Sequence, residues 1–103
     1  MVRLVSIEPS ERSTKKYVAT FSEEGKARAK RIHFGAKGMN DYIIYHKDDP
    51  VNAENRKRLY IQRHRDAENW NNPMTAGALS RYILWNLPTL QSSIRDFKQR
   101  FHL

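Results

Sequence analysis

The residues best suited to chemistry lie in the segment RKRLYIQRHR, where five permanent cations occur without an acidic residue: Arg56, Lys57, Arg58, Arg63 and Arg65. Side chains seven positions apart share one face of a helix, so Arg56 would lie beside Arg63 and Arg58 beside Arg65. Such cations can follow phosphates, and arginine can also reach into a groove. The alternative is a solvated helix face, but such a face usually mixes charges to gain i,i+4 pairs. The segment therefore predicts contact with a polyanion.

A second basic segment precedes the first and is expected to form a two-stranded ribbon and the loop after it. A basic ribbon can enter a groove or lie along a phosphate backbone, and the alternative is that lysines protect edge strands from pairing with other chains. Its cations are Lys15, Lys16, Lys26, Arg28, Lys30, Arg31 and Lys37. If eight phosphates were neutralised, the affinity should fall with salt with a log–log slope of about −7.

The excess charge of the chain lies in these two segments. There are 19 Lys and Arg against 11 Asp and Glu, which gives a formal charge of +8 and a pI near 10.1. Residues 12–37 carry +6 and residues 56–65 carry +5, whereas the connector between them, residues 38–55, carries −3. This distribution favours a polyanionic partner, and we expect nucleic acid, DNA in preference to RNA.

Residues for catalysis, metal binding or cofactor binding do not assemble along the sequence. The four histidines lack the spacing of metal ligands, and Asp48 with Asp49 is better explained as the start of a helix than as a cation site. The loop at residues 35–38, GAKG, lacks the Gly-Lys-Ser/Thr end of a P-loop and is expected to be a tight turn. Neighbouring residues supply no set of nucleophile, base and orienting group. We therefore expect no cofactor, no metal and no enzymatic activity.

The length and composition predict one soluble, intracellular domain that comprises residues 1–103. Without cysteine, neither disulfides nor a cysteine-ligated zinc can stabilise the fold, which is typical of a reducing compartment. The N-terminus has too short an apolar run for a signal peptide, and no segment approaches the roughly 20 apolar residues of a membrane span.

The elements that must position the cations are strands first and helices afterwards. Residues 2–8, 15–21 and 26–34 are expected to be strands, and the last two would form a hairpin around a turn at residues 23–25. Strict alternation in residues 26–34 would mix charged and large apolar side chains on one face. We therefore expect a β-bulge there, and a helical segment at residues 26–31 is the alternative.

The C-terminal part predicts three helices. One begins at Pro50 after an acidic N-cap and runs to about Arg65, a second comprises residues 76–85 after the N-cap Thr75, and the last begins after Thr89. Leu90, Ile94, Phe97 and Phe101 give the last helix its core face, and residues 41–45 are compatible with either strand or helix. The expected fold is α+β, a small antiparallel sheet packed against about three helices.

The segment Asn69–Thr89 contains both tryptophans and the longest apolar run, so we expect it to form the core. Trp85 lies within the apolar run and is expected to pack there. Trp70 is flanked by asparagines, and a more open indole could stack on bases. Arg81 projects from an otherwise apolar helix, so it is either an anchor for backbone carbonyls or a phosphate contact.

Three stretches resemble a known family: KKYVATF, KRIHFGAKGMNDY and NWNNPMTAGALSRYILWNLPTLQSSIRDFKQRF. They are similar to small basic proteins of unknown function that are encoded by nucleocytoplasmic large DNA viruses, and the similarity extends from about Lys15 to Leu103. The resemblance implies a viral, intracellular protein, in the viral factory, the host nucleus or the virion, and it favours the hairpin over the helical alternative. The size, the charge and the basic, strand-rich N-terminal half are also similar to those of the small archaeal chromosomal protein that bends DNA, without a shared motif.

The leading hypothesis is a non-enzymatic nucleic-acid-binding protein, directed at double-stranded DNA with low sequence specificity, that serves viral genome packaging or architecture. The alternative is a virion structural or protein-interaction component whose basic faces meet acidic partners. A third hypothesis, a nuclease, requires carboxylates that the fold would have to cluster. The oligomeric state is open at this level.

Overall fold

The N-terminal third of the chain forms an antiparallel sheet in the computed structural model, which describes residues 1–103. Its strands are β1 (Val2–Pro9), β2 (Lys15–Glu23) and β3 (Lys30–Ala36), with β2 in the centre. The helical elements that follow are α1 (Tyr42–Asp48), α2 (Pro50–His64), α3 (Ala76–Leu79), the π-helical turn η1 (Ser80–Leu84) and α4 (Leu90–Phe101). This order confirms the α+β prediction. None of the helices is long and apolar enough to cross a membrane.

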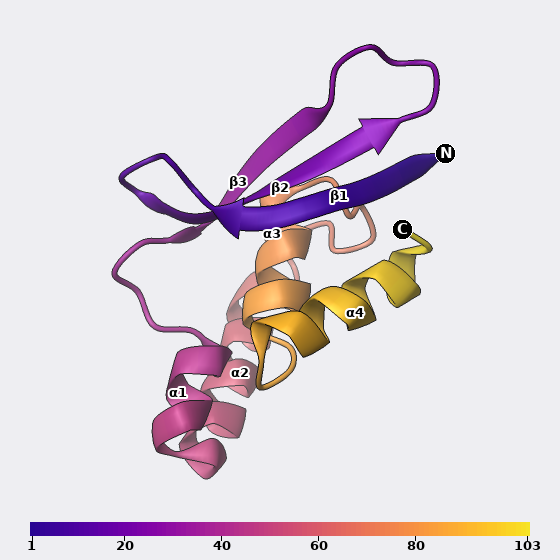
Figure 1. Cartoon of the computed structure of the whole chain (residues 1–103). Coiled ribbons are helices and arrows are strands. Elements are labelled where there is room, and N and C mark those ends of the chain that lie inside the picture. The colour runs from indigo at the N-terminus through magenta and orange to yellow at the C-terminus, as the bar shows by residue number, and fades with distance from the viewer.

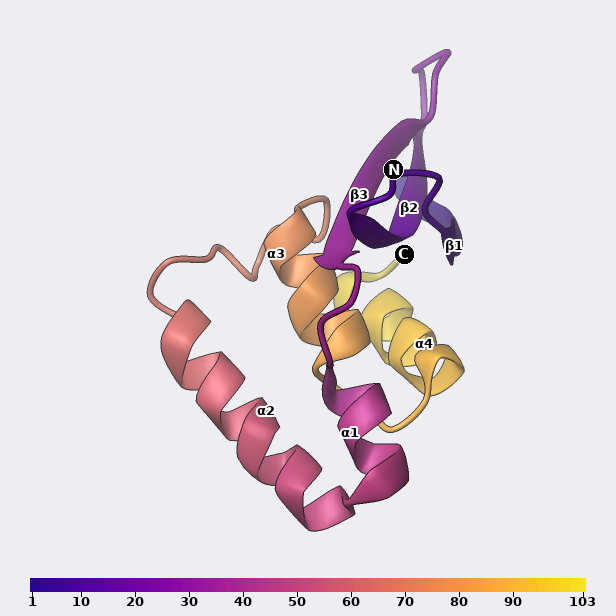
Figure 2. The same cartoon turned by 90° about the vertical axis from the view of Figure 1, so that its left-hand side faces the viewer.

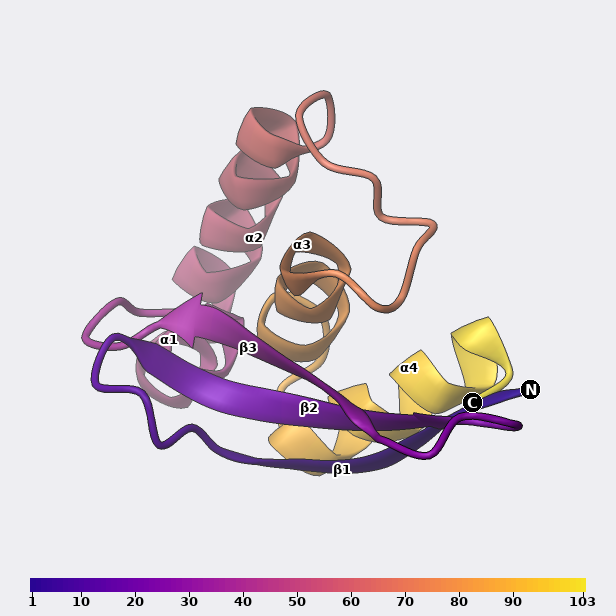
Figure 3. The same cartoon turned by 90° about the horizontal axis from the view of Figure 1, so that it is seen from above.

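The sheet and the C-terminal helices form two layers. Figure 1 shows α3 and α4 beneath the sheet, and Figure 3 shows the sheet from above with α2 standing to one side. The molecule is elongated, 45 × 27 × 25 Å, and Figure 2 places the β2–β3 loop at one end and the α1–α2 pair at the other. The loop of the second basic segment thus lies at one end of the molecule, whereas residues 56–65 form the C-terminal part of α2, which runs from α1 back toward the sheet.

The hydrophobic core joins the sheet to the segment Asn69–Thr89, as the sequence predicts. Aromatic side chains from the sheet and from α4 meet aliphatic ones from α3 and η1 with almost no exposure to solvent: Phe21, Phe34, Leu79, Ile83, Leu84 and Phe97. Tyr82 and Trp85 are only partly buried and pack against the edge of this cluster. The core thus holds the base of the sheet, while α2 lies outside it.

The predicted bulge is wrong in its position. Strands β2 and β3 pair in unbroken register, from Lys15 opposite Ala36 to Phe21 opposite Lys30. The irregularity lies in β1, where the register shifts between Leu4 and Ser6. No bulge is needed in the hairpin because β3 begins four residues later than expected and residues 24–29 form a loop, which takes Lys26 and Arg28 off the strand.

Side-chain caps explain where the helices begin. Asp41 Oδ1 accepts the Ile44 N–H at 3.1 Å, which settles residues 41–45 in favour of a helix. Asp49 caps α2 in the same way ahead of Pro50, and Thr75 and Thr89 cap α3 and α4. These helix starts were predicted, but α1 brings the number of α-helices above the three expected.

The helix predicted at residues 76–85 does not remain α-helical. After α3, the backbone widens into η1, where the Trp85 N–H donates to the Ser80 carbonyl at 3.1 Å. A π-type turn inserts one additional residue, so the side chains after it are rotated relative to an α-helical continuation. Ser80 and Trp85, at the two ends of this turn, both line the cleft described below.

Candidate functional site

The cations of α2 occupy different sides of the helix. Arg56 and Arg63 line a cleft together with Tyr60, whereas Arg58 and Arg65 are exposed to solvent on another face. Lys57 is turned inward: its Nζ donates to the Asn86 carbonyl at 3.0 Å and lies 4.5 Å from the centroid of the Tyr42 ring. The predicted pairing of Arg56 with Arg63 and of Arg58 with Arg65 agrees with this arrangement.

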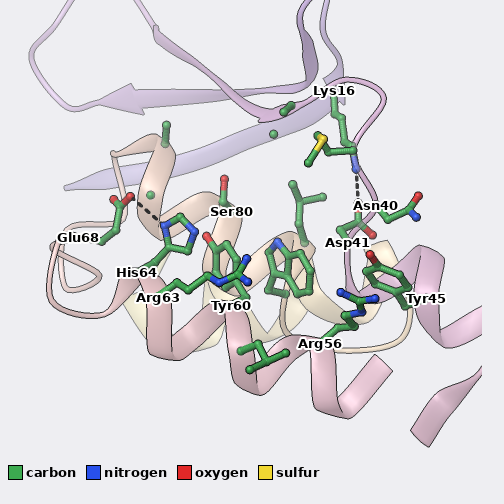
Figure 4. A pocket seen from close by; sticks show the side chains of 18 of the residues that line it. Lys16, Asn40, Asp41, Tyr45, Arg56, Tyr60, Arg63, His64, Glu68 and Ser80 are labelled. Carbon is green, nitrogen blue, oxygen red and sulfur yellow. Dashed lines mark hydrogen bonds and ion pairs between the residues drawn. The ribbon is translucent and has the colours of Figure 1, made fainter. Parts of the chain in front are cut away.

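The cleft has a volume of about 580 Å³ and lies between α2, the α3–η1 segment and the open end of the β2–β3 hairpin. Its apolar and small residues include Leu59, Leu84, Trp85 and Gly77, and Lys15 and Lys16 come from the start of β2. In Figure 4, Arg56, Tyr60, Arg63 and His64 extend from α2 on one side of the cleft, and Lys16 and Asp41 lie on the other side, below the sheet. Cations from both basic segments therefore meet here.

Three of the cleft cations have no acidic partner. Lys15, Arg56 and Arg63 form no ion pair within 4.0 Å, and the guanidinium of Arg56 lies 5.4 Å from the centroid of the Tyr45 ring. Lys16 differs from its neighbour, because its Nζ donates to Asp41 Oδ2 at 2.6 Å and the two side chains are only 13% and 5% exposed. Lys16 thus has a structural partner, and the other three are free to meet an anion.

Aromatic rings form one wall of the cleft. Tyr60 lies between Trp85, at 4.6 Å between ring centroids and 6° between planes, and His64, at 4.4 Å and 29°. Burial, with a smaller contribution from the Glu68 carboxylate, raises the pKa of Tyr60 to about 12. Its phenol is therefore neutral near pH 7 and adds no negative charge beside the arginines.

Several polar groups of the cleft are without hydrogen-bond partners in the chain. The side chains of Asn40 and Ser80 make no hydrogen bond, and His64 Nδ1 is 3.9 Å from Glu68 Oε1, beyond hydrogen-bond distance. Both residues line the cleft, Asn40 from the segment between β3 and α1 and Ser80 from the start of η1. The cleft thus combines free cations, a planar aromatic wall and unused donors and acceptors.

The hairpin cations after Lys16 lie away from the cleft. Lys26, Arg28 and Lys30 are exposed at the β2–β3 loop, and Lys26 forms an exposed pair with Glu23 at 3.1 Å. Arg31 donates to both carboxylate oxygens of Glu11, at 2.7 and 2.9 Å, and this contact lowers the pKa of Glu11 to about 2. Lys37 is exposed beyond the end of β3 and lines the second cleft instead.

The side chains of Trp70 and Arg81 are partly buried and contact each other within the chain. Arg81 Nη1 donates to the Trp85 carbonyl at 2.7 Å, and its guanidinium lies 5.6 Å from the Trp70 ring and 5.0 Å from the Tyr82 ring. Burial lowers the pKa of Arg81. Of the two alternatives for Arg81, the carbonyl contact favours the anchor. Trp70 is partly buried, its Nε1 has no partner, and it does not line the cleft.

One cluster could not be found from neighbouring residues. Ser10 Oγ lies 2.7 Å from His33 Nδ1, and the Glu11 carboxylate lies 3.8 Å from His33 Nε2. A serine, a histidine and a carboxylate are the parts of a nucleophilic site, but neither cleft borders these residues and Arg31 holds the carboxylate. The cluster ties the β1–β2 connection to β3. No group of three or more His, Asp or Glu side chains is arranged to hold a metal ion.

The sequence signals therefore divide into two sets. Four predicted cations are held by partners within the chain: Lys16, Arg31, Lys57 and Arg81. The other nine extend into solvent or into the cleft: Lys15, Lys26, Arg28, Lys30, Lys37, Arg56, Arg58, Arg63 and Arg65. Two of these have a partner at the surface, since Lys26 pairs with Glu23 at 3.1 Å and Arg58 Nη2 donates to Asn55 Oδ1 at 2.5 Å. The stack of Tyr60 with Trp85 and His64 was missed, because residues 25 positions apart in sequence give no periodic signal.

The chain belongs to the DUF5754 family, a family of unknown function whose sequence model matches residues 5–64. The match extends from within β1 to the end of α2, so it includes both basic segments except Arg65 and ends before Asn69–Thr89. Comparison with curated proteins and with solved structures gave no match.

Proposed function

We propose that this member of the DUF5754 family is a non-enzymatic nucleic-acid-binding protein of low sequence specificity, with double-stranded DNA as its main partner. The observation that carries the proposal is the convergence of Lys15, Arg56 and Arg63 on one cleft without an acidic partner, while Arg58 and Arg65 extend from the same helix into solvent. The viral, intracellular setting that the sequence resemblance implies makes genome packaging or architecture the proposed role.

Phosphate contact explains this distribution of charge better than solubility does. Adjacent cations on one helix repel each other, and a helix that serves only solubility gains more from mixed charges. Arg58 and Arg65 are seven residues apart, which places them about 10 Å apart along the helix axis. The hairpin loop adds three cations at one end of the molecule, whose whole length of 45 Å corresponds to about 13 base pairs. Such contacts follow the backbone and carry no base code.

The test is a fluorescence-anisotropy titration of labelled duplex DNA over a series of salt concentrations. If all nine cations that extend into solvent or into the cleft meet phosphates, the log–log slope should approach about −8, and fewer contacts give a proportionally smaller slope. Binding that is absent at low salt, or that does not change with salt, would contradict the proposal.

Charge-reversal variants show which basic segment contributes. Reversal of Arg56, Arg58, Arg63 and Arg65 to glutamate should make the log–log salt slope shallower by about 3.6, since four phosphate contacts are lost. The matched control reverses Lys26, Arg28 and Lys30 of the hairpin loop. Lys57 stays unchanged in both variants because its contact with the Asn86 carbonyl is structural. If neither reversal weakens binding, the cations on these faces do not carry the function.

A second cleft supports the alternative of a protein-interaction component. This cleft has a volume of about 730 Å³, contains Ile43, Ile44 and Leu90, and has Lys37 and Lys47 at its border. Ile44 is 39% exposed and nearby Met39 is 65% exposed, so an acidic partner with apolar side chains fits it. A stoichiometric protein that is co-purified after nuclease treatment, and that is lost from an Ile44→Ser variant, would favour this function.

A further inference from the structure

We infer that the cleft between α2 and the α3–η1 segment binds one unpaired nucleotide, so that the protein holds DNA more tightly where a strand is unpaired. The inference rests on the proposed function and names the part of the nucleic acid that the cleft accepts. It assigns a ligand to Lys15, Arg56 and Arg63 together with the aromatic and polar groups between them.

The cleft contains an apolar wall that a paired duplex would not contact. A paired duplex presents phosphates and groove edges on the outside, and its base faces are stacked inside. Phosphates need cations at the border of the cleft, and they gain nothing from the apolar wall formed by Leu59, Leu84 and Trp85. A volume of about 580 Å³ lies within the range of small-molecule sites, which are mostly apolar with a few placed polar groups. A single nucleotide combines a planar apolar base with an anion and fits this combination.

The positions of the charges fit a ligand with a phosphate at its edge. Arg56 and Arg63 are seven residues apart, about 10 Å along the α2 axis, with Leu59 and Tyr60 between them. A base that lies against the wall between the two arginines would place the phosphates on either side within reach of the two guanidinium groups. Arginine suits this task because its planar donors match phosphate oxygens.

The unused polar groups fit the edge of a base. Asn40 and Ser80 line the cleft, their side chains make no hydrogen bond in the chain, and each can donate and accept. Both faces of Tyr60 are covered by Trp85 and His64, so a base does not need to open this stack. The outer face of His64, whose side chain is 42% exposed, remains available for stacking.

An acidic peptide is the competing occupant, because its carboxylates could meet the same three cations. It would leave the exposed face of His64 without a planar partner, and it makes no particular use of the Asn40 amide and the Ser80 hydroxyl that line the cleft. The nucleotide uses all three kinds of group, so we favour it.

The first test uses Trp85 as a reporter inside the cleft. A Trp70→Phe variant leaves Trp85 as the single tryptophan, and deoxyadenosine monophosphate is titrated against its fluorescence. We expect a saturable change that inorganic phosphate at the same concentration does not reproduce. In the matched Trp85→Phe variant, Trp70 does not line the cleft but its ring stacks on that of Tyr60 at 6.5 Å, so its response should be smaller than that of Trp85. No saturable change of Trp85 would overturn the inference, as would displacement of the nucleotide by poly-glutamate at equal charge.

The second test compares two labelled duplexes of equal length, one fully paired and one with an internal gap of unpaired nucleotides. We expect at least threefold tighter binding to the gapped duplex. Ser80→Leu narrows the cleft and should remove this preference without changing the salt slope on the paired duplex. The Arg58→Ala/Arg65→Ala variant should weaken binding to both probes equally, since these arginines lie outside the cleft.

The outcomes separate the inference from the proposed function. If both duplexes bind equally and with salt dependence, the cleft inference is overturned and the proposed function stands. If neither binds, both fail. Circular dichroism checks the folding of the Ser80→Leu variant, and Arg56→Ala/Arg63→Ala provides a second cleft variant that should abolish the nucleotide response of Trp85.

Discussion

Replacement of Lys16 by methionine should destabilise the protein strongly, although Lys16 is part of a segment that the sequence assigns to phosphate binding. Its ammonium and the Asp41 carboxylate are 2.6 Å apart with 13% and 5% of their side chains exposed. Removal of one partner from a buried ion pair costs about 3–5 kcal/mol, because the other charge stays buried. Asp41 keeps its capping hydrogen bond from the Ile44 N–H, so we expect the lower end, about 3 kcal/mol. For a chain of this size, that loss lowers Tm by more than about 10 °C.

Urea unfolding followed by tryptophan fluorescence measures the effect, and the neighbouring residue supplies the control. Lys15→Met removes a cation without an acidic partner, so it should change stability by less than about 0.5 kcal/mol and weaken DNA binding instead. A Lys16→Met/Asp41→Asn double variant should recover part of the loss, with a coupling of about 1–3 kcal/mol, since asparagine also caps helices. If Lys16→Met lowers the free energy of unfolding by less than about 1 kcal/mol with an unchanged m-value, the ion pair is open in solution. Lys16 would then be available to a polyanion, as the sequence predicts.

Three further predictions concern the scaffold. Burial, assisted by nearby cations, lowers the pKa of His33 below 6.5, so the folded state binds fewer protons at this residue than the unfolded chain does. The free energy of unfolding should therefore fall as the pH drops below about 6.5. Urea titrations at several pH values should show a smaller fall for His33→Gln. Trp70→Phe should cost less than about 1 kcal/mol in urea unfolding, because the buried Nε1 that it removes has no partner. Gly35→Ala should lower the free energy of unfolding by about 1–3 kcal/mol, because φ is +79° and the added Cβ would come within 2.8 Å of Leu84 Cδ1. Gly25→Ala is the control: its φ is +84° but the space around it is open, so it should lower the free energy of unfolding less in the same assay.

Local signals in the sequence were sufficient for the elements and insufficient for their partners. Three helix starts are marked by an N-cap, which is an acid ahead of Pro50 in one helix and Thr75 or Thr89 in the other two. Each N-cap lies directly before the helix that it begins, so the sequence alone predicts these starts. The bulge was predicted in the wrong place because no periodic pattern in the sequence marks where the hairpin loop ends. Residues 24–29 form a loop, so β3 begins only at Lys30. The π-turn at Ser80–Leu84 is equally silent in sequence, since the same apolar residues suit an α-helix.

The candidate site shows the same limit more sharply. That α2 would be basic, with Arg56 and Arg63 on one face, followed from spacing alone. Whether each cation is free depended on tertiary contacts: Lys15 and Lys16 are adjacent and chemically identical, yet only Lys16 reaches the Asp41 carboxylate, 25 positions away. Tyr60 and Trp85 are likewise 25 positions apart, and only the fold brings their rings into a stack.

The division between held and free cations is itself an argument for function. Where the fold uses a cation, it supplies a specific partner: a buried carboxylate for Lys16, a bidentate carboxylate for Arg31, and backbone carbonyls for Lys57 and Arg81. The arginines in the cleft and on the outer face of α2 receive no carboxylate, although the chain has eleven acidic residues and places Glu54 on the same helix. Unpaired like charges on one helix cost stability by mutual repulsion, and no carboxylate of the protein offsets that cost at these arginines. A polyanion that binds this surface would offset it, so α2 and the cleft beside it are where such a partner should be sought.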